Sequence, residues 1–205
     1  MKCEGFTRGD FNTFTIDGLE ERMESIRMRI QPKFKVIGEV LTADLSSSLQ
    51  NEMYLHIAKH LRRTINPPKD TWLAIAANKR GYKQHPHFQV GLFDDHLFIW
   101  LAFIYELPNK GNIAKNFLNN LDYITETVPD HFYVSLDHTK KDAKPINAID
   151  LKNSLERFRD VKKAEFLIGR HLSSDDPIVQ DGDKLVQFIR ETFETLIPIY
   201  KLSFE

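Results

Sequence analysis

The chain has 205 residues, of which 41% are hydrophobic and 28% charged, and its formal net charge is −1. This composition is that of a folded globular protein, and it excludes an intrinsically disordered chain and one that attracts polyanions over its whole surface. A length near 200 residues predicts one domain spanning 1–205.

The sequence also predicts the compartment. The apolar run "LFIWLAFIY" at 97–105 is about half of the ~18 residues that a membrane helix needs. The N-terminus "MKCEGFTRGDF" lacks the apolar stretch of a signal peptide, and the one cysteine, Cys3, can form no internal disulfide. We therefore expect a cytoplasmic protein without a membrane partner.

The N-terminal segment, about 8–66, is predicted to be helical. Apolar residues recur every three or four positions from Leu19 to Ile30, and Pro32 is expected to end that helix and begin the next. A third helix is predicted over about 52–64. It should end before Pro67, because a residue that precedes proline disfavours helical geometry.

The segment from about 70 to 205 is predicted to contain the sheet. The run "TWLAIAAN" is compatible with a strand, and two alternating runs flank Asp94 and Asp95 as in an antiparallel hairpin. A loop of even length would place one uniformly apolar set on the core face: Phe88, Val90, Leu92, Leu97, Ile99, Leu101 and Phe103. The other face would carry a mixed set, where a ligand could lie: His87, Gln89, Gly91, Phe93, His96, Phe98, Trp100 and Ala102.

Helices and strands then alternate irregularly. We expect a helix containing Ile113–Ile124, a strand at "HFYVSLD", a helix capped by Asp150, a strand at "AEFLIGRHL", and a last helix that Pro198 ends or kinks. This order is not a regular βαβ repeat. It predicts an α+β fold: a helical N-terminal third, then a mainly antiparallel sheet with interspersed packing helices.

Charge is distributed unevenly along the chain. Between His56 and His87, seven basic residues stand against the single acid Asp70, and four histidines share the window. This window carries a formal charge of +6, so the remainder carries −7. A solvated positive face would explain this pattern, and so would a binding site for an anion.

An anion site would use planar guanidinium groups, mobile ammonium groups and flat aromatic surfaces. The candidate ligand-binding residues are Arg62, Arg63, Lys79, Arg80, Tyr82, Lys83 and Trp100. The partner would be a phosphorylated small molecule or a nucleic acid. If Arg62 and Arg63 close a helix, their favourable interaction with its dipole is an alternative explanation.

The histidines allow two further kinds of site. His56 and His60 are spaced for one face of a helix, and His85 and His87 for one face of a strand. We expect no metal site, and a site formed by these four histidines is the less favoured alternative. If the protein is an enzyme, which the sequence leaves open, the acid/base candidates are His60, His85 and His87. The remaining histidines, such as His138, are expected to be structural. No glycine-rich phosphate loop occurs, and no cofactor is expected.

Four stretches resemble a known family: "DGLEERM", "HIAKHLRRTINPPKDTW", "NKRGYKQHPHFQVGLF" and "HLFIWLAFIYE". They are similar to the uncharacterised YktB-like proteins of Bacillus and related Firmicutes, and the likeness covers nearly the whole chain. The resemblance implies a cytoplasmic bacterial protein of mixed α and β structure. It carries no activity or catalytic residues, so an anion-binding module, an enzyme and a protein-partner-binding domain all remain possible.

Overall fold

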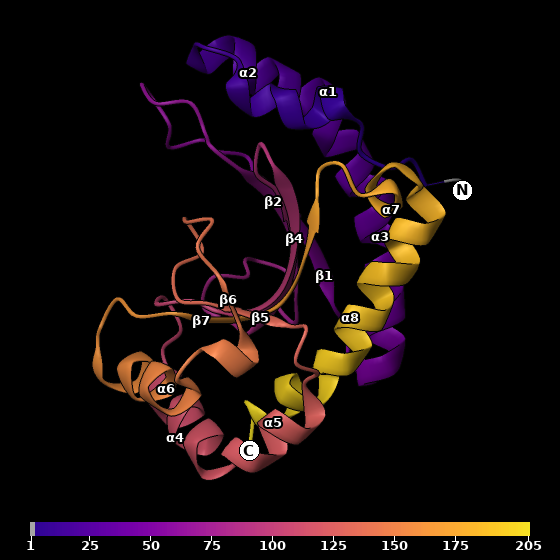
Figure 1. Ribbon diagram of the computed structural model, residues 1–205. Coiled ribbons are helices and arrows are strands. Elements are labelled where there is room, and N and C mark those ends of the chain that lie inside the picture. The colour runs from indigo at the N-terminus through magenta and orange to yellow at the C-terminus, as the bar shows by residue number, and fades with distance from the viewer. Residues whose placement is uncertain (1–2) are drawn as a thin grey trace.

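In the computed structural model, which describes residues 3–205, seven strands form one antiparallel sheet in the order β1-β2-β3-β4-β7-β5-β6 (Figure 1). The strands are β1 (Tyr54–Ile57), β2 (Thr71–Ala76), β3 (His87–Leu92), β4 (His96–Phe103), β5 (Tyr133–Ser135), β6 (Lys144–Pro145) and β7 (Phe166–Ser173). The predicted α+β class with a mainly antiparallel sheet is confirmed.

The α-helices are α1 (Arg8–Phe11), α2 (Leu19–Ser25), α3 (Gln31–Leu49), α4 (Lys110–Asn119), α5 (Leu121–Thr127), α6 (Leu151–Asp160), α7 (Pro177–Gln180) and α8 (Gly182–Leu202). Helices α3 and α8 run along one face of the sheet, and α4, α5 and α6 gather at one end (Figure 1). Short 3₁₀ turns, η1 (Asn12–Thr15) and η3 (Ile146–Ala148), complete the helical elements of the described chain.

The sequence predicted that Pro32 ends the first long helix, and this prediction is wrong. Helix α2 continues through a π-helical segment, η2 (Ile26–Ile30), directly into α3, and Pro32 lies in the first turn of α3. Proline lacks a backbone N–H and its ring crowds the carbonyl of the preceding turn. The wider turn of the π segment lets the chain pass this position and remain helical.

The helix predicted over about 52–64 is wrong. Helix α3 ends at Leu49, and the following residues form β1 and then an irregular connection over 58–70. Leu55 pairs with Ile75 in β2 and packs against α3, so an alternating pattern and pairing with a neighbouring strand override the helical spacing. The helices of the N-terminal segment therefore end near 49 rather than 66, and the sheet begins at Tyr54 rather than near 70.

The central hairpin has the predicted register. His87 lies opposite Ala102 and Leu92 opposite Leu97, so the apolar set predicted for the core face turns toward the helices: Phe88, Val90, Leu92, Leu97, Ile99, Leu101 and Phe103. Phe88 packs its ring 4.8 Å from that of Phe193 in α8. The apolar face is therefore the core, and the mixed face lies on the opposite side of the sheet.

The C-terminal half follows the prediction with two differences. Asp150 caps α6 by accepting a hydrogen bond from the backbone N–H of Asn153 at 2.9 Å, as expected. The single helix predicted around 113–124 is instead the pair α4 and α5. Pro198 lies inside α8, which continues to Leu202 because the residues of its last turn are buried in the core.

The long apolar run at 97–105 belongs mainly to β4. Within residues 3–205, no helix is long and apolar enough to cross a membrane.

Candidate functional site

The mixed face of the sheet carries polar and aromatic side chains outside the main core, among them Trp72, Gln89 and Trp100. Two connections lie against it. The connection between β2 and β3 reaches it through Tyr82, whose hydroxyl accepts a hydrogen bond from Nε1 of Trp72 at 3.0 Å. The connection between β5 and β6 reaches it through His138, whose ring centroid lies 6.3 Å from that of Trp72.

A pocket of about 740 Å³ opens at the edge of this face, between β1 and the β2–β3 connection. We call it the basic pocket. Its polar lining consists of His56, Lys59, Asn78, Arg80, Lys83, Gln84, His85 and Glu106, with Gly81 and Tyr82 beside them. Leu55, Ile57 and Ala58 supply an apolar part of the lining.

Asn78 organises the polar wall of the basic pocket. Its backbone carbonyl accepts a hydrogen bond from Nε2 of His56 at 2.9 Å, and its side-chain amide donates to Nε2 of His85 at 2.9 Å. Its side-chain oxygen accepts from the backbone N–H of Arg80 at 2.8 Å. One asparagine thus holds two imidazole rings and the turn that carries the cations.

The charge of the pocket is predominantly positive. Lys59, Arg80 and Lys83 are exposed at its border, and Glu106 is its one acidic residue. Glu106 pairs with Lys83 at 3.2 Å. Two ammonium or guanidinium groups, those of Lys59 and Arg80, therefore remain without an ion pair among the described residues.

Tyr82 lines the pocket, and the fully buried His87 lies behind it. The two rings are 4.9 Å apart, and burial raises the pKa of the Tyr82 phenol, so it stays neutral. Burial also lowers the pKa of His87 to about 3. Its Nδ1–H donates to the carbonyl of His85 at 2.8 Å, and its Nε2 accepts from Gln89 at 2.8 Å. His87 is therefore a neutral, fully bonded ring, which disfavours an acid/base role.

Other candidates from the sequence lie outside the basic pocket. His60 and Arg63 line a different cavity, of about 580 Å³, beside Glu20 and Glu24 of α2. Arg62 is exposed and Lys79 is exposed in the turn beside the basic pocket, but neither lines it. Trp100 is buried, with its ring 4.7 Å from His171.

His60 has a structural environment of its own. It takes a left-handed conformation with φ 51, hydrogen bonds to the hydroxyl of Thr71 at 3.1 Å, and packs edge-on against Trp72. Burial, with a smaller contribution from Arg63, lowers its pKa to about 4. His60 thus lines the cavity beside α2 and not the basic pocket. The four histidines of the metal alternative form no common ligand group within residues 3–205.

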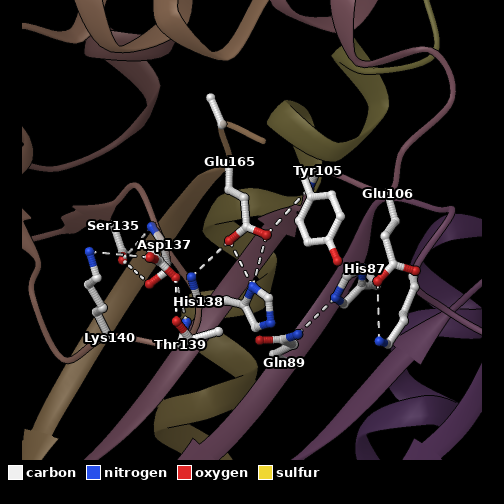
Figure 2. Close-up of polar contacts among 12 residues, drawn as sticks. His87, Gln89, Tyr105, Glu106, Ser135, Asp137, His138, Thr139, Lys140 and Glu165 are labelled. Atoms are coloured by element: carbon white, nitrogen blue, oxygen red, sulfur yellow. Dashed lines mark hydrogen bonds and ion pairs between the residues drawn. The ribbon is translucent and has the colours of Figure 1, made fainter. Parts of the chain in front are cut away.

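A second cluster on the mixed face was missed by the sequence reasoning. Nδ1 of His138 donates to the carboxylate of Glu165, with distances of 2.7 and 2.9 Å to the two oxygens (Figure 2). Backbone N–H groups of His138 and Tyr105 also donate to this buried carboxylate. Burial alone would lower the pKa of His138, but the bond and charge of Glu165 raise it above its ordinary value.

Asp137 lies close enough to this pair to suggest a metal group. Ligand atoms of Asp137, His138 and Glu165 lie within 4.8 Å of one another. However, Asp137 accepts hydrogen bonds from the N–H and hydroxyl of Thr139, and Nδ1 of His138 is directly hydrogen-bonded to Glu165 (Figure 2). These bonds occupy the atoms that would ligate, so we interpret the cluster as a Glu–His hydrogen-bonded pair.

Asp70 is a nearly buried carboxyl group close to this pair. Only 6% of the residue is exposed, and burial raises its pKa to about 6, against the opposing charges of His138 and Arg63. No hydrogen bond to the Asp70 side chain from another residue occurs within 3–205. Asp70 and His138 therefore both have pKa values above their ordinary ones.

The sequence contains weak signals for the site residues that it did not lead us to predict. Glu165 is an acid directly before the apolar start of β7, and Asp70 is the only acid in the basic window. Lys59 and Asn78 flank strands that face the pocket. Pairing His138 with Glu165 requires the neighbouring positions of β5 and β7, which no local pattern reveals.

Comparison with known proteins gives a uniform result. Residues 6–200 match the family model described as a domain of unknown function, DUF1054. The chain is 65% identical over 203 residues to a UPF0637 protein of Shouchella clausii, covering 99% of this chain and 96% of the relative. It is 64% identical to a UPF0637 protein of Oceanobacillus iheyensis (98% and 97% covered) and 50% identical to one of Listeria monocytogenes serotype 4b, with both chains fully covered.

Proposed function

The chain belongs to the DUF1054 family, which is the YktB-like family that the sequence resembles. We propose that the basic pocket of this protein binds an anionic, phosphate-bearing ligand. The observation that carries the proposal is the charge of the pocket. Lys59, Arg80 and Lys83 border it, and the one acid among its lining residues is already paired with Lys83.

The shape and polar groups of the pocket support a ligand larger than a phosphate ion. A volume of about 740 Å³ lies within the range of small-molecule sites, roughly 300–1,000 Å³. Tyr82 and the aliphatic lining provide apolar surface for a ring or chain, while the cations provide hydrogen-bond donors for phosphate oxygens. A nucleotide or a sugar phosphate combines these two features.

Calorimetric and thermal-unfolding titrations with inorganic phosphate, pyrophosphate, nucleotides and sugar phosphates test this function. A ligand at about 100 times its Kd should stabilise the folded protein by about 2.7 kcal/mol. The double variant Arg80→Ala/Lys83→Ala should weaken binding at least tenfold. The matched control Lys162→Ala/Lys163→Ala removes two exposed cations that follow α6 and should bind normally.

Absence of binding to every phosphate compound would overturn the proposal. Equal loss of affinity in the pocket variant and the control would also overturn it, because net charge rather than the basic pocket would then govern binding.

The Glu165–His138 pair favours acid/base catalysis as a second candidate function. A carboxylate that holds Nδ1–H of an imidazole leaves Nε2 to exchange a proton with a substrate, and such proton transfer contributes roughly 100-fold or more to rate. In this second candidate, His138 and not His60, His85 or His87 is the acid/base group.

Mass spectrometry of the bound ligand tests this second candidate. After incubation with the protein, a substrate should be converted to product, and His138→Gln should slow conversion about 100-fold while Kd changes less than twofold. Recovery of an unaltered ligand would leave binding alone as the function of the site.

A further inference from the structure

We propose that the phosphate-bearing ligand is a nucleic acid, held by the basic pocket and by the connection between β1 and β2. This connection, residues 58–70, is called here the β1–β2 arm. The inference rests on the proposed function, because the pocket would bind one phosphate group of the same strand. The arm would contact the phosphates and bases that follow.

The β1–β2 arm projects from the edge of the sheet and exposes aliphatic side chains at its tip. In Figure 1 it extends beyond the body of the sheet near α2. Leu61 and Ile65 are 84% and 80% exposed, the two most exposed large hydrophobic residues of the described chain. Exposure of aliphatic side chains to water is unfavourable, so two of them on a projecting segment indicate a surface that a binding partner covers.

Cations surround these aliphatic residues. Lys59, Arg62, Arg63 and Lys69 all belong to the arm and are exposed. None of them forms an ion pair with a described residue. Apart from the buried Asp70 of the arm itself, the acidic residues beside the arm include Glu20 and Glu24 of α2, which line the smaller cavity. The strand would therefore lie on the side toward the basic pocket.

The arm and the pocket share one positive surface. Lys59 lines both the basic pocket and the cavity beside the arm, so it joins Arg80 and Lys83 on one side to Arg63 on the other. A small phosphate compound can neutralise only one part of this surface. A nucleic acid strand carries a charge for about every 3.4 Å of its axis, and it meets several separated cations at once.

The combination of arginine and aliphatic residues on the arm indicates which kind of phosphate-bearing ligand would bind. Proteins that bind a nucleic acid groove insert Leu, Ile or Pro between bases while neighbouring arginines contact phosphates. The arm offers the exposed Leu61 and Ile65 beside Arg62 and Arg63. Arg22 fixes the base of the arm by donating to the carbonyl of Pro68 at 2.8 Å, so the tip projects from an anchored stem.

Fluorescence anisotropy with labelled 20-nucleotide single strands and duplexes, in DNA and RNA forms, tests this inference. The whole protein should bind at least one form, with affinity falling steeply as salt rises. The arm variant Arg62→Ala/Arg63→Ala should weaken binding at least tenfold and reduce the slope of log Kd against log salt by about 1–2. The control Lys162→Ala/Lys163→Ala should bind like the unchanged protein.

A parallel titration with a mononucleotide separates this inference from the proposed function. The arm variant should keep its mononucleotide affinity, whereas Arg80→Ala/Lys83→Ala should lose affinity for both ligands. Mononucleotide binding without polymer binding, or polymer binding unaffected by the arm variant, would overturn the inference and leave the pocket function intact. If the unchanged protein bound neither the mononucleotide nor the polymer, the inference would be overturned, and the proposed function with it if no other phosphate compound bound.

Discussion

At the scale of single residues, Asp70 shows how burial governs protonation on the mixed face. A carboxyl group with a folded-state pKa of about 6 and a reference value of 3.8 binds its proton more tightly in the folded state. The stability that this preference contributes is complete below pH 4 and is lost as the pH rises through 6. At neutral pH the ionised, nearly buried carboxylate destabilises the fold.

Asp70→Asn should remove this pH dependence. The variant should unfold at the same urea concentration as the unchanged protein near pH 4 and be more stable by about 3 kcal/mol at pH 8, because the pKa lies at about 6 instead of 3.8 and one pKa unit corresponds to about 1.4 kcal/mol. Urea unfolding at both pH values measures the difference. A variant that is equally or less stable at pH 8 would show that Asp70 is ionised at little cost.

The Glu165–His138 pair supports a prediction about the pKa of a histidine. Glu165 raises the pKa of His138, so Glu165→Gln should lower it while the side-chain oxygen still accepts the backbone hydrogen bonds. Titration of the His138 imidazole by NMR measures the shift. Asp122→Asn, which removes an exposed carboxylate on α5, is the control and should leave the titration unchanged. A His138 pKa that is the same in all three proteins would contradict this geometry.

At the scale of elements, β4 and β7 approach each other more closely than a side chain at position 169 allows. Gly169 lies opposite Trp100, and a methyl group at Gly169 would overlap the carbonyl oxygen of Ile99. The space beside Gly91, on the face where the sequence allowed a ligand, is filled by the ring of Phe98. Both glycines thus serve the packing of the sheet.

Gly169→Ala should destabilise the protein by about 2–3 kcal/mol, because the overlap is with backbone that cannot move aside. Gly111→Ala in the exposed first turn of α4 meets no neighbouring atom and should stabilise by about 0.5–1 kcal/mol. Chemical unfolding of the two variants provides the comparison. Equal effects would contradict the close approach of β4 and β7.

At the scale of the whole molecule, the cations of the positive window lie on two adjoining parts of one surface. The basic pocket and the β1–β2 arm hold most of its cations, while the net charge of the chain is −1. Electrostatic recognition would therefore be local, and orientation of a ligand would depend on the uneven distribution of charge. This arrangement also exposes several trypsin sites on one projecting segment.

Limited trypsin digestion should first cleave the native protein after Arg62 or Arg63. The connection between β5 and β6 carries the exposed Lys140 and Lys141, but Lys141 pairs with Asp94 and Asp95 and should be cut more slowly. Mass spectrometry of early fragments identifies the order. Initial cleavage after Lys140 or Lys141 would show that the arm is held more tightly than its exposure suggests.

The sequence by itself determined the elements whose pattern is local. Alternation around Asp94–Asp95 predicted the hairpin register and separated the core face from the mixed face, and Asp150 predicted the start of α6. Both depend on the side-chain period of a strand or on one cap, which neighbouring residues define.

Only the tertiary structure decided how distant segments meet. Pairing with β2 made a strand of 54–57, separated His60 from the basic pocket, and placed Lys59 and Asn78 in it. Likewise, pairing of β5 with β7 brought His138 to Glu165 across 27 residues of chain. A strand chooses its neighbour by burying apolar surface over the whole molecule, and that choice leaves no signature in any single stretch of sequence.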